Sequence, residues 1–483
     1  MMTIKETNSR EVFKNISLDS LVPQDHIIRK IDKAIDLSFI RDKVKHLYSN
    51  IGTASIDPVV IFKIMIIQYT FGIRSMRETI REIEVNVAYR WYIGYQFDEK
   101  IPHFSAVGKV YKRKFEGTNI FEEIFQEIIS EIIKSKLINT ENVFIDGTHI
   151  KANANNKKSS IETVEQSSKF YQEILDTEIN MDRESRNKKT LKESEVIKTK
   201  KIRVSTTDPD CGVFHKGEHK KVFAYSANTA CDKNNFILDF VLAPGNTHDS
   251  VSFLELYEKL ARKYNDIKNV VLDSGYKIPA IAKIILDDNK VPIMPYKRPM
   301  TKDGFFKKYE YVYDEYYDCY ICPNNKVLKY TTTNREGYKE YKSNATTCQN
   351  CEFINKCTES KNTTKVIMRH IWEEYMEKVE DIRHTKGSKE IYSLRSQTIE
   401  RVFADAKELH GMRYTLYRGL ERVKNEITLK FACMNLKKLA LMKARKGFIY
   451  LKVFKFVENS TRIIKKVKND YIVFKTSSHL STI

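Results

Sequence analysis

The chain has 483 residues, 41% of them hydrophobic, and its 83 Lys and Arg against 63 Asp and Glu give a formal net charge of +20. This length excludes a single ordinary domain and predicts two or three, each with enough material for a core. The basic balance favours a polyanionic partner, although the abundance of Lys, Asn, Ile and Tyr is also what base-composition bias in the coding DNA produces.

The sequence contains no segment typical of a membrane span or a signal peptide. The most apolar stretch, residues 59–73, contains Lys63 and Gln68 and is too short to cross a bilayer. The first fifteen residues lack an apolar h-region. We therefore expect a cytoplasmic protein that makes no use of a membrane and keeps its cysteines reduced.

Residues 1–135 are expected to form an all-helical domain. Pro58, after Ser55-Ile56-Asp57, starts one helix, and a capping box from Ser75 to Glu78 starts a second one over SMRETIREIEVNVAYRWYIGY. A third helix begins near Ser105. Short helices that carry Lys and Arg and are joined by short turns resemble a helix-turn-helix DNA reader. A plain helical bundle with solvated charge explains the pattern equally well.

From residue 141 the pattern changes to strands alternating with helices. The strands are ENVFIDGTHIKAN, a hairpin of KVFAYSANTACD and FILDFVLAPG, then NVVLDSGY and VPIMPY. Two amphipathic helices, SVSFLELYEKLARKY and IPAIAKIILDDNK, separate the later strands. This order matches an α/β ribonuclease-H-like fold, in which three strands are followed by a helix, a strand, a helix, a strand and a closing helix. This order brings the ends of the first and fourth strands together.

We therefore expect an α/β catalytic domain over residues 136–483, interrupted twice. Residues 155–205 are charge-dense and predict a solvated helical excursion or a partly disordered loop. Residues 300–370 form a cysteine-rich insertion before the last catalytic helix. A basic tail, residues 437–483, carries twelve Lys and Arg against two acids. Such charge suits DNA phosphates, although the alternation in KVFKFVENS and DYIVFKT also fits a plain β segment.

Three acidic residues have the settings of a two-metal site. Asp146 and Asp273 follow apolar, largely β-branched runs that read as buried strands, and Glu400 lies on a strongly periodic helix. Oxygen ligands of this kind hold two divalent cations, of which one activates the attacking oxygen and the other stabilises the leaving oxygen of a phosphodiester.

Other acids have local explanations. Asp232 stands by a hairpin turn, Asp239 lies within a strand, and Asp249 precedes an amphipathic helix as an N-cap. His248 is adjacent to that cap, and a structural role is favoured for it over contact with a phosphate.

The helix that carries Glu400 has one apolar stripe, expected to face the core, at Ile399, Val402, Phe403, Ala406 and Leu409. Lys407 follows Glu400 by seven residues and returns to nearly the same helical angle. Carboxylate and ammonium then project from one face, as a metal ligand and a phosphate contact would. The alternative is a surface Glu and Lys on an amphipathic helix.

Five of the eight cysteines cluster, as Cys319-x2-Cys322, Cys348-x2-Cys351 and Cys357. Paired C-x2-C motifs about two dozen residues apart have the spacing of a tetrahedral thiolate zinc site. A fifth cysteine leaves the ligand set open, and the Asn/Thr/Tyr-rich segment between the pairs reads as loose. A structural Zn²⁺ is favoured over a catalytic one, because four thiolates leave no open coordination position.

The motifs together resemble bacterial insertion-sequence transposases of the DDE class, in the group with a separate N-terminal helical domain. The resemblance extends over most of the chain. Its pieces are SLDSLVPQDHIIRKID, TTDPDCG, APGNTHDS, LDSGY, CPNNKVLKY with CQNCEFINKC, and IERVFADAKELHGMRYTLYRGLERVKNEITLKFACMNLKKL. Tyr392-x2-Arg395-x4-Glu400-x6-Lys407 is similar to the tyrosine-arginine-glutamate-lysine signature of related transposases, with one extra residue between arginine and glutamate.

The resemblance implies that Asp146, Asp273 and Glu400 bind Mg²⁺ or Mn²⁺, as two ions, and catalyse the reaction. Lys407, Arg395 and Tyr392, with Arg413 and Arg418 after them, are the implied DNA contacts. It further implies double-stranded DNA partners (terminal inverted repeats and target), a homodimer or higher oligomer when ends are synapsed, and a place near the bacterial nucleoid.

The expected reaction is hydrolysis at the element's ends followed by joining of the 3′ ends to target DNA. Two other functions remain open. One is a metal-dependent nuclease that cuts without joining, and the other is a catalytically silent, transposase-derived DNA-binding protein.

Overall fold

The computed structural model describes residues 16–49, 51, 55–165, 171–191, 199–216 and 220–446. Within it the chain divides into two compact units. The first unit comprises Met1–Leu137, Ala406–Gly411 and Asn425–Ile483, and the second comprises Ile138–Asp405 and Met412–Lys424. The sequence-based division had instead kept everything after residue 135 together.

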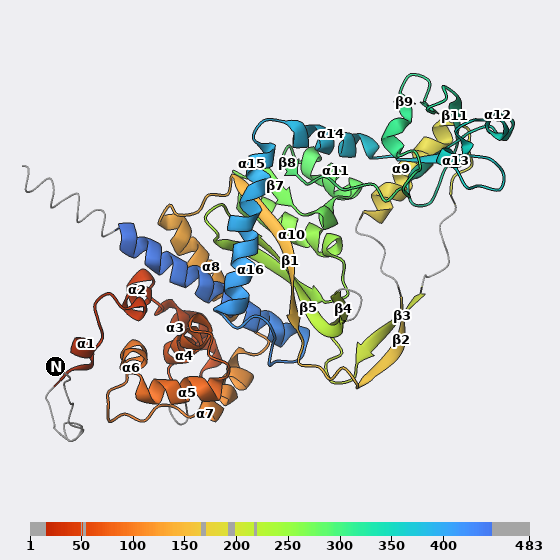
Figure 1. Cartoon of the computed structure of the whole chain (residues 1–483). Coiled ribbons are helices and arrows are strands. Elements are labelled where there is room, and N and C mark those ends of the chain that lie inside the picture. The colour runs from red at the N-terminus through yellow and green to blue at the C-terminus, as the bar shows by residue number, and fades with distance from the viewer. Residues whose placement is uncertain are drawn as a thin grey trace, which may run out of the picture. The chain divides into compact units, whose positions relative to one another are not determined.

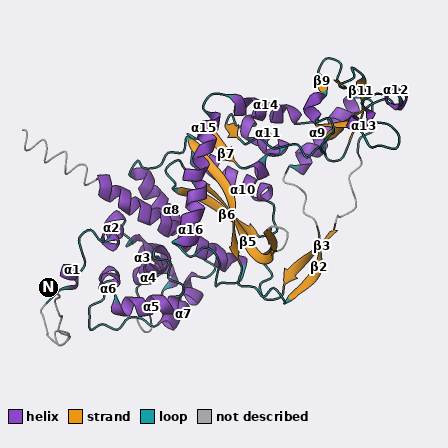
Figure 2. Cartoon of the chain, in the orientation of Figure 1, coloured by secondary structure: helices purple, strands orange, loops and turns teal. Residues whose placement is uncertain are grey.

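The described N-terminal part of the first unit is helical (Figure 2). Its α-helices are α1 (Leu18–Leu21), α2 (Ile27–Ala34), α3 (Phe39–Val44), α4 (Pro58–Thr70), α5 (Met76–Val85), α6 (Val87–Ile93), α7 (Phe104–Val110) and α8 (Ile120–Lys134). Helix α4 is buried on nearly all sides, which explains why its sequence is almost continuously apolar.

The predicted helix starts at Pro58 and Ser75 are confirmed, because Asp57 caps α4 and the Ser75 side chain accepts the Glu78 N–H at the start of α5. The second helix was predicted too long. Asn86 interrupts it, since the Asn86 carboxamide accepts the N–H groups of Ala88 and Tyr89 and so caps a new helix, α6.

The second unit is built on a mixed sheet of six strands (Figure 1). These are β1 (Asn142–Lys151), β4 (Gly212–Lys216), β5 (Lys220–Cys231), β6 (Ile237–Pro244), β7 (Asn269–Leu272) and β8 (Val291–Ile293). The order is β4-β5-β1-β7-β8, with β6 also paired to β5. The β5–β6 hairpin is antiparallel as predicted, whereas β1, β7 and β8 run parallel. The predicted neighbourhood of the first and fourth core strands is therefore confirmed as the β1–β7 pair.

Helices α10 (Asp249–Lys263) and α11 (Pro279–Asp287) pack their apolar residues against the sheet. On β1 the residues in that core are Val143 and Ile145, and on β7 they are Val270 and Leu272. Because side chains alternate along a strand, the residues between them point to the opposite face of the sheet.

The charged excursion is more ordered than its sequence suggested. Strands β2 (Ser159–Glu165) and β3 (Thr199–Ser205) pair, and α9 (Gln172–Ser185) lies between them in the chain. Helix α9 buries Leu175 and Ile179 against Ala280 and Trp372, so it is anchored rather than solvated.

The cysteine-rich insertion folds around a second sheet, which corrects the expectation of a loose segment. Its five strands are β9 (Val312–Asp314), β10 (Cys319–Ile321), β11 (Val327–Thr333), β12 (Tyr338–Lys342) and β13 (Val366–His370), all antiparallel. Short helices α12 (Ala345–Gln349) and α13 (Ile354–Cys357) lie between the last two strands in the chain.

Helices α14 (Glu373–His384), α15 (Ser388–Ser393) and α16 (Ile399–Glu408) follow the insertion. The predicted stripe on α16 is buried at Ile399, Val402, Phe403 and Ala406. Leu409 is 51% exposed, contrary to prediction, because α16 ends at Glu408 and the side chain lies past its last turn. Residues 420–446 form the last described helix, so the first ten residues of the expected basic tail are helical. Residues 447–483 lie outside the described part.

None of the helices in the described residues has the length and apolar character that crossing a membrane requires.

The core of the second unit gives a direct test of this architecture. Replacing the fully buried Leu256 of α10 by Ala removes contacts with the sheet, and we expect the unfolding free energy to fall by about 2 to 5 kcal/mol. Leu416→Ala is the matched control in the same unit, where the side chain is 45% exposed and the expected loss is about 0.5 kcal/mol or less. Equal losses in thermal or urea unfolding would contradict the assigned core.

Candidate active site

Asp146 lies on β1, and Asp273 follows the end of the neighbouring strand β7. The parallel register of β1 and β7 pairs Phe144 with Val271 and Ile145 with Leu272. Continued by one residue, it places Asp146 opposite Asp273. Since Ile145 and Leu272 face the α10 side, both carboxylates project from the other face of the sheet.

Arg395 is buried and bound to the first of these acids. It lies in the short 3-10 turn Leu394–Gln397, with its side chain 6% exposed. One guanidinium nitrogen donates to Asp146 Oδ2 at 2.7 Å and another donates to the Ile145 carbonyl at 3.4 Å. Arg395 therefore orients Asp146, and in this structure it does not present its guanidinium to solvent.

The pKa of Asp146 is raised to about 6. Burial is the main cause, and the negative charges of Asp273 and Asp249 add to it, while Arg395 and the Gly147 N–H oppose it. Arg395 thus opposes the effect of burial on the pKa of Asp146 only in part.

Glu400 is exposed in the first turn of α16. Glu400 and the two aspartates all influence the pKa of one side chain, Tyr392, near the end of α15. Burial raises the pKa of the Tyr392 hydroxyl, Arg395 lowers it, and Asp273, Asp146 and Glu400 all raise it further. All three predicted acids therefore act on one phenol. Lys407 follows Glu400 by two turns on the same helix.

Asp249 is a fourth acid near this site, for which the sequence had predicted a role as an N-cap. His248, and not Asp249, caps α10, because His248 Nδ1 accepts the Ser250 N–H at 3.2 Å. The Asp249 carboxylate instead rests on Gly147, where Oδ1 would lie only 2.6 Å from an added Cβ. A larger residue at position 147 would displace it. In the sequence, the Asp146-Gly147 pair of VFIDGTH was the signal that another group packs closely against β1 at this point.

Tyr276 was also missed. It follows Asp273 in the LDSGY motif, is fully buried, and donates its hydroxyl to Asn228 Oδ1 at 2.7 Å on β5. This hydrogen bond ties the segment after Asp273 to the strand on the far side of β1.

The other rival acids have structural roles. Asp232 accepts the N–H groups of Asn139 and Phe236, both at 2.7 Å, and so closes the hairpin turn. Asp239 is buried in β6 and pairs with Lys263 at 2.6 Å.

Arg413 and Arg418 lie on a segment that runs beside the end of β1. Backbone hydrogen bonds join Lys151 to Arg413 and Thr415, and Arg418 donates to the Asn153 carbonyl at 2.9 Å. Both arginines are exposed, so this edge of the second unit carries accessible positive charge.

The cysteines separate into two groups. Cys322, Cys348, Cys351 and Cys357 are half-buried around one small cavity, whereas Cys319 is buried elsewhere. Cys211, Cys231 and Cys433 are buried.

The acidic site fits a divalent cation in the chemistry of its donors. Asp146, Asp273 and Glu400 offer oxygen ligands. Burial, with a smaller contribution from the charges of Asp273 and Asp249, raises the pKa of Asp146, and a bound cation would favour the ionised carboxylate. In the side-chain positions of this structure, no group of three or more His, Cys, Asp or Glu among the described residues could hold a metal ion. Binding therefore requires the carboxylates to draw together.

Two family models match the chain. Residues 16–113 match a "Transposase domain (DUF772)" and residues 321–440 match a "Transposase DDE domain". The second match includes Arg395, Glu400 and Lys407. Among solved structures, the piggyBac transposase synaptic complex with hairpin DNA has 11% identity and a TM-score of 0.30, covering 92% of this chain and 78% of that chain. Comparison with curated proteins gave no match.

The pKa of Asp146 predicts how cation binding depends on pH. Asp146 binds its proton up to about pH 6 in the folded state but only to about pH 4 when unfolded, so without metal the free energy of unfolding falls as the pH rises between these values. A cation must displace that proton. We expect Mg²⁺ at ten times its Kd to raise Tm by about 2 to 4 °C at about pH 8 and by much less at about pH 5.

The measurement is thermal unfolding with and without Mg²⁺ at both pH values. Asp146→Asn should abolish the Mg²⁺ shift, and Asp405→Asn, on the exposed side of α16, should keep it. Equal shifts at both pH values in the parent would refute the assignment of Asp146 as a cation ligand.

Proposed function

We propose, from the premise that this chain is a DDE-class transposase with two matched transposase domains, that it cleaves the ends of an insertion sequence with divalent cations and joins the 3′ ends to target DNA. The observation that carries this proposal is the parallel pairing of β1 with β7, whose register ends one residue before Asp146 and Asp273, together with Arg395 bound to Asp146.

The strand order supports a ribonuclease-H-like core. In the sheet of the second unit β1, β5 and β6 form an antiparallel set, and β7 and β8 extend the sheet in parallel on the other side of β1. Helices α10 and α11 then connect successive strands. In such a sheet the two central parallel strands are the natural place for two cooperating carboxylates.

Asp146, Asp273 and Glu400 are the proposed ligands of two Mg²⁺ ions. When bound, such cations activate an attacking oxygen and stabilise the leaving oxygen of an in-line phosphodiester displacement. Arg395 keeps Asp146 in one orientation through its charge-assisted hydrogen bond. Tyr392, whose hydroxyl all three acids influence, is proposed to contact the DNA backbone.

DNA binding is proposed to rest mainly on phosphate contacts. Lys407 on α16 and the exposed Arg413 and Arg418 supply charge close in the chain to Glu400. The helices of the first unit, with Arg74, Arg77 and Arg81 near α5, are the proposed reader of the inverted repeats, and two copies of the chain would synapse two ends. Phosphate contacts of this kind make affinity fall steeply with salt.

The test uses labelled DNA carrying the inverted repeats that bracket this reading frame. We expect the parent with Mg²⁺ to give both cleaved ends and strand-transfer products. Asp146→Asn, Asp273→Asn and Glu400→Gln should each lower cleavage by at least about a hundredfold, because each removes a cation ligand.

Asp405→Asn is the matched control for Glu400→Gln. It lies on the same helix and loses only a surface pair with Arg401, worth at most about 1 kcal/mol, so it should cleave like the parent. Cleavage without joining would identify a nuclease. Binding without cleavage would identify a silent DNA-binding protein, and undiminished cleavage by all three variants would mean that the active site is elsewhere.

A further inference from the structure

The two faces of β10 separate the cysteines of the insertion. Side chains alternate along a strand, and Tyr320 and Cys322 lie on the side of the small core formed with Tyr311, Leu328 and Tyr341. Cys319 points to the other side, where it lines a surface cavity with Ile321 and Arg186. Cys319 therefore cannot reach the other four thiols without turning the strand over.

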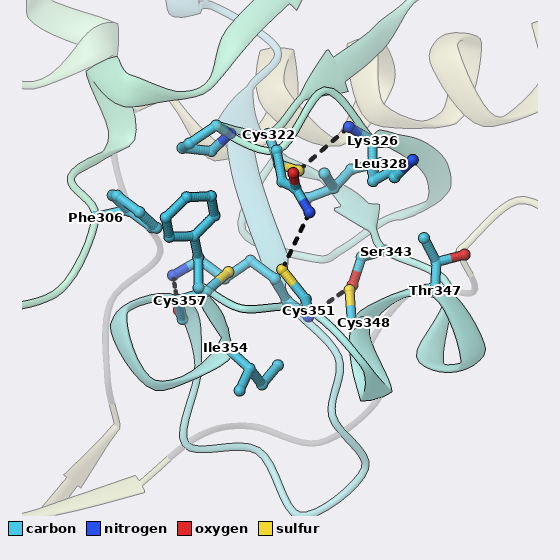
Figure 3. A pocket seen from close by; sticks show the side chains of 14 residues that line it. Phe306, Cys322, Lys326, Leu328, Ser343, Thr347, Cys348, Cys351, Ile354 and Cys357 are labelled. Carbon is cyan, nitrogen blue, oxygen red and sulfur yellow. Dashed lines mark hydrogen bonds between the residues drawn. The ribbon is translucent and has the colours of Figure 1, made fainter.

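The remaining four cysteines enclose one cavity of about 20 Å³, drawn in Figure 3. Cys322 follows β10, Cys348 lies in α12, Cys351 follows α12, and Cys357 ends α13. They come from three separate segments of the chain. Such a volume holds about one water molecule or one ion.

Polar groups are directed at three of these sulfur atoms. The Lys326 N–H donates to Cys322 Sγ at 3.3 Å, and the Asn324 side-chain amide donates to Cys351 Sγ at 3.4 Å. The Tyr311 hydroxyl lies 3.1 Å from Cys357 Sγ. Donors aimed at sulfur stabilise thiolates that bind metals, because they spread the negative charge of the ligand set.

The surroundings also balance charge. Lys326 and Lys365 both line the cavity, and Lys365 Nζ donates to the Cys357 carbonyl at 2.7 Å. Four thiolates around a divalent ion carry a net charge of about −2, which the positive charge of Lys365 offsets in part.

We propose that Cys322, Cys348, Cys351 and Cys357 bind one structural Zn²⁺ as a tetrahedral four-thiolate site, and that Cys319 takes no part. Zinc–sulfur bonds of about 2.3 Å require the thiols to rotate inward around the ion, since no such group is already formed among the described side chains. All four positions are thereby filled, so this ion has no role in the chemistry of the acidic site. The inference does not depend on transposase activity.

A bound metal ion would stabilise the cysteine-rich insertion, because its apolar core is small. The buried core of the insertion comprises only Tyr311, Tyr320, Leu328, Tyr341 and Ile367. Small cores contribute only a few kcal/mol, and domains of this size are commonly stabilised by a metal or by disulfides. The four-cysteine site would connect the β10–β11 turn to α12 and α13, two short helices that are not part of the sheet.

The first test is zinc content of the full-length protein after desalting. We expect one Zn²⁺ per chain in the parent and in Cys319→Ser. Cys322→Ser, Cys348→Ser, Cys351→Ser and Cys357→Ser should each lose most of it. A parent without zinc, or a Cys319→Ser variant that loses it while Cys322→Ser keeps it, would overturn the proposal.

The second test needs no mutation, so a misfolded variant cannot obscure it. Alkylation of the native protein, read out residue by residue by mass spectrometry, should label none of the four cysteines before chelation and all four after it. Cys319, buried in both cases, should react slowly throughout. If the four react equally fast with and without chelator, zinc is not bound by them. Co²⁺ substitution should add the visible absorption of tetrahedral cobalt–thiolate coordination, and its absence would also contradict the site.

Discussion

The parallel pairing of β1 with β7 is the constraint on which the rest of the second unit depends. It fixes Asp146 and Asp273 side by side, since a parallel register with both preceding residues facing α10 leaves the next pair on the opposite face. A shift by one residue in either strand would turn one carboxylate into the apolar core. Ile145 and Leu272 help to hold this register, because both are fully buried in the core that the sheet shares with α10 and α11.

Bringing acids together in this way is unfavourable by itself. Burial and the charges of Asp273 and Asp249 raise the pKa of Asp146 to about 6, and Arg395 only partly opposes them. The arrangement is costly unless a cation joins it, and functional sites are where such costs are retained. Gly147 is required for this close packing, because only a residue without Cβ allows the Asp249 carboxylate so close to β1.

Much of the fold could be predicted from local patterns. Helix starts at Pro58 and Ser75, the β5–β6 hairpin and the buried stripe of α16 follow from capping residues, turn residues and periodicity. The failures also have local causes. The Asn86 side chain accepts backbone N–H groups and so ends one helix and starts the next. Leu409 continues the apolar periodicity of α16, but it lies after the last residue of that helix. The helix within residues 155–205 was one of two predicted alternatives, but its anchoring could not be predicted because Trp372 lies far away in sequence.

The sequence by itself determined the chemistry on offer: three acids in distinctive settings, a cluster of cysteines and a basic chain resembling DDE-class transposases. Only the tertiary structure decided which groups meet. It placed Arg395 on Asp146 and set Cys319 on the face of β10 away from the other four cysteines. Motif spacing cannot specify these relations, because strand register and the facing of side chains are set by cores whose members lie tens to hundreds of residues apart.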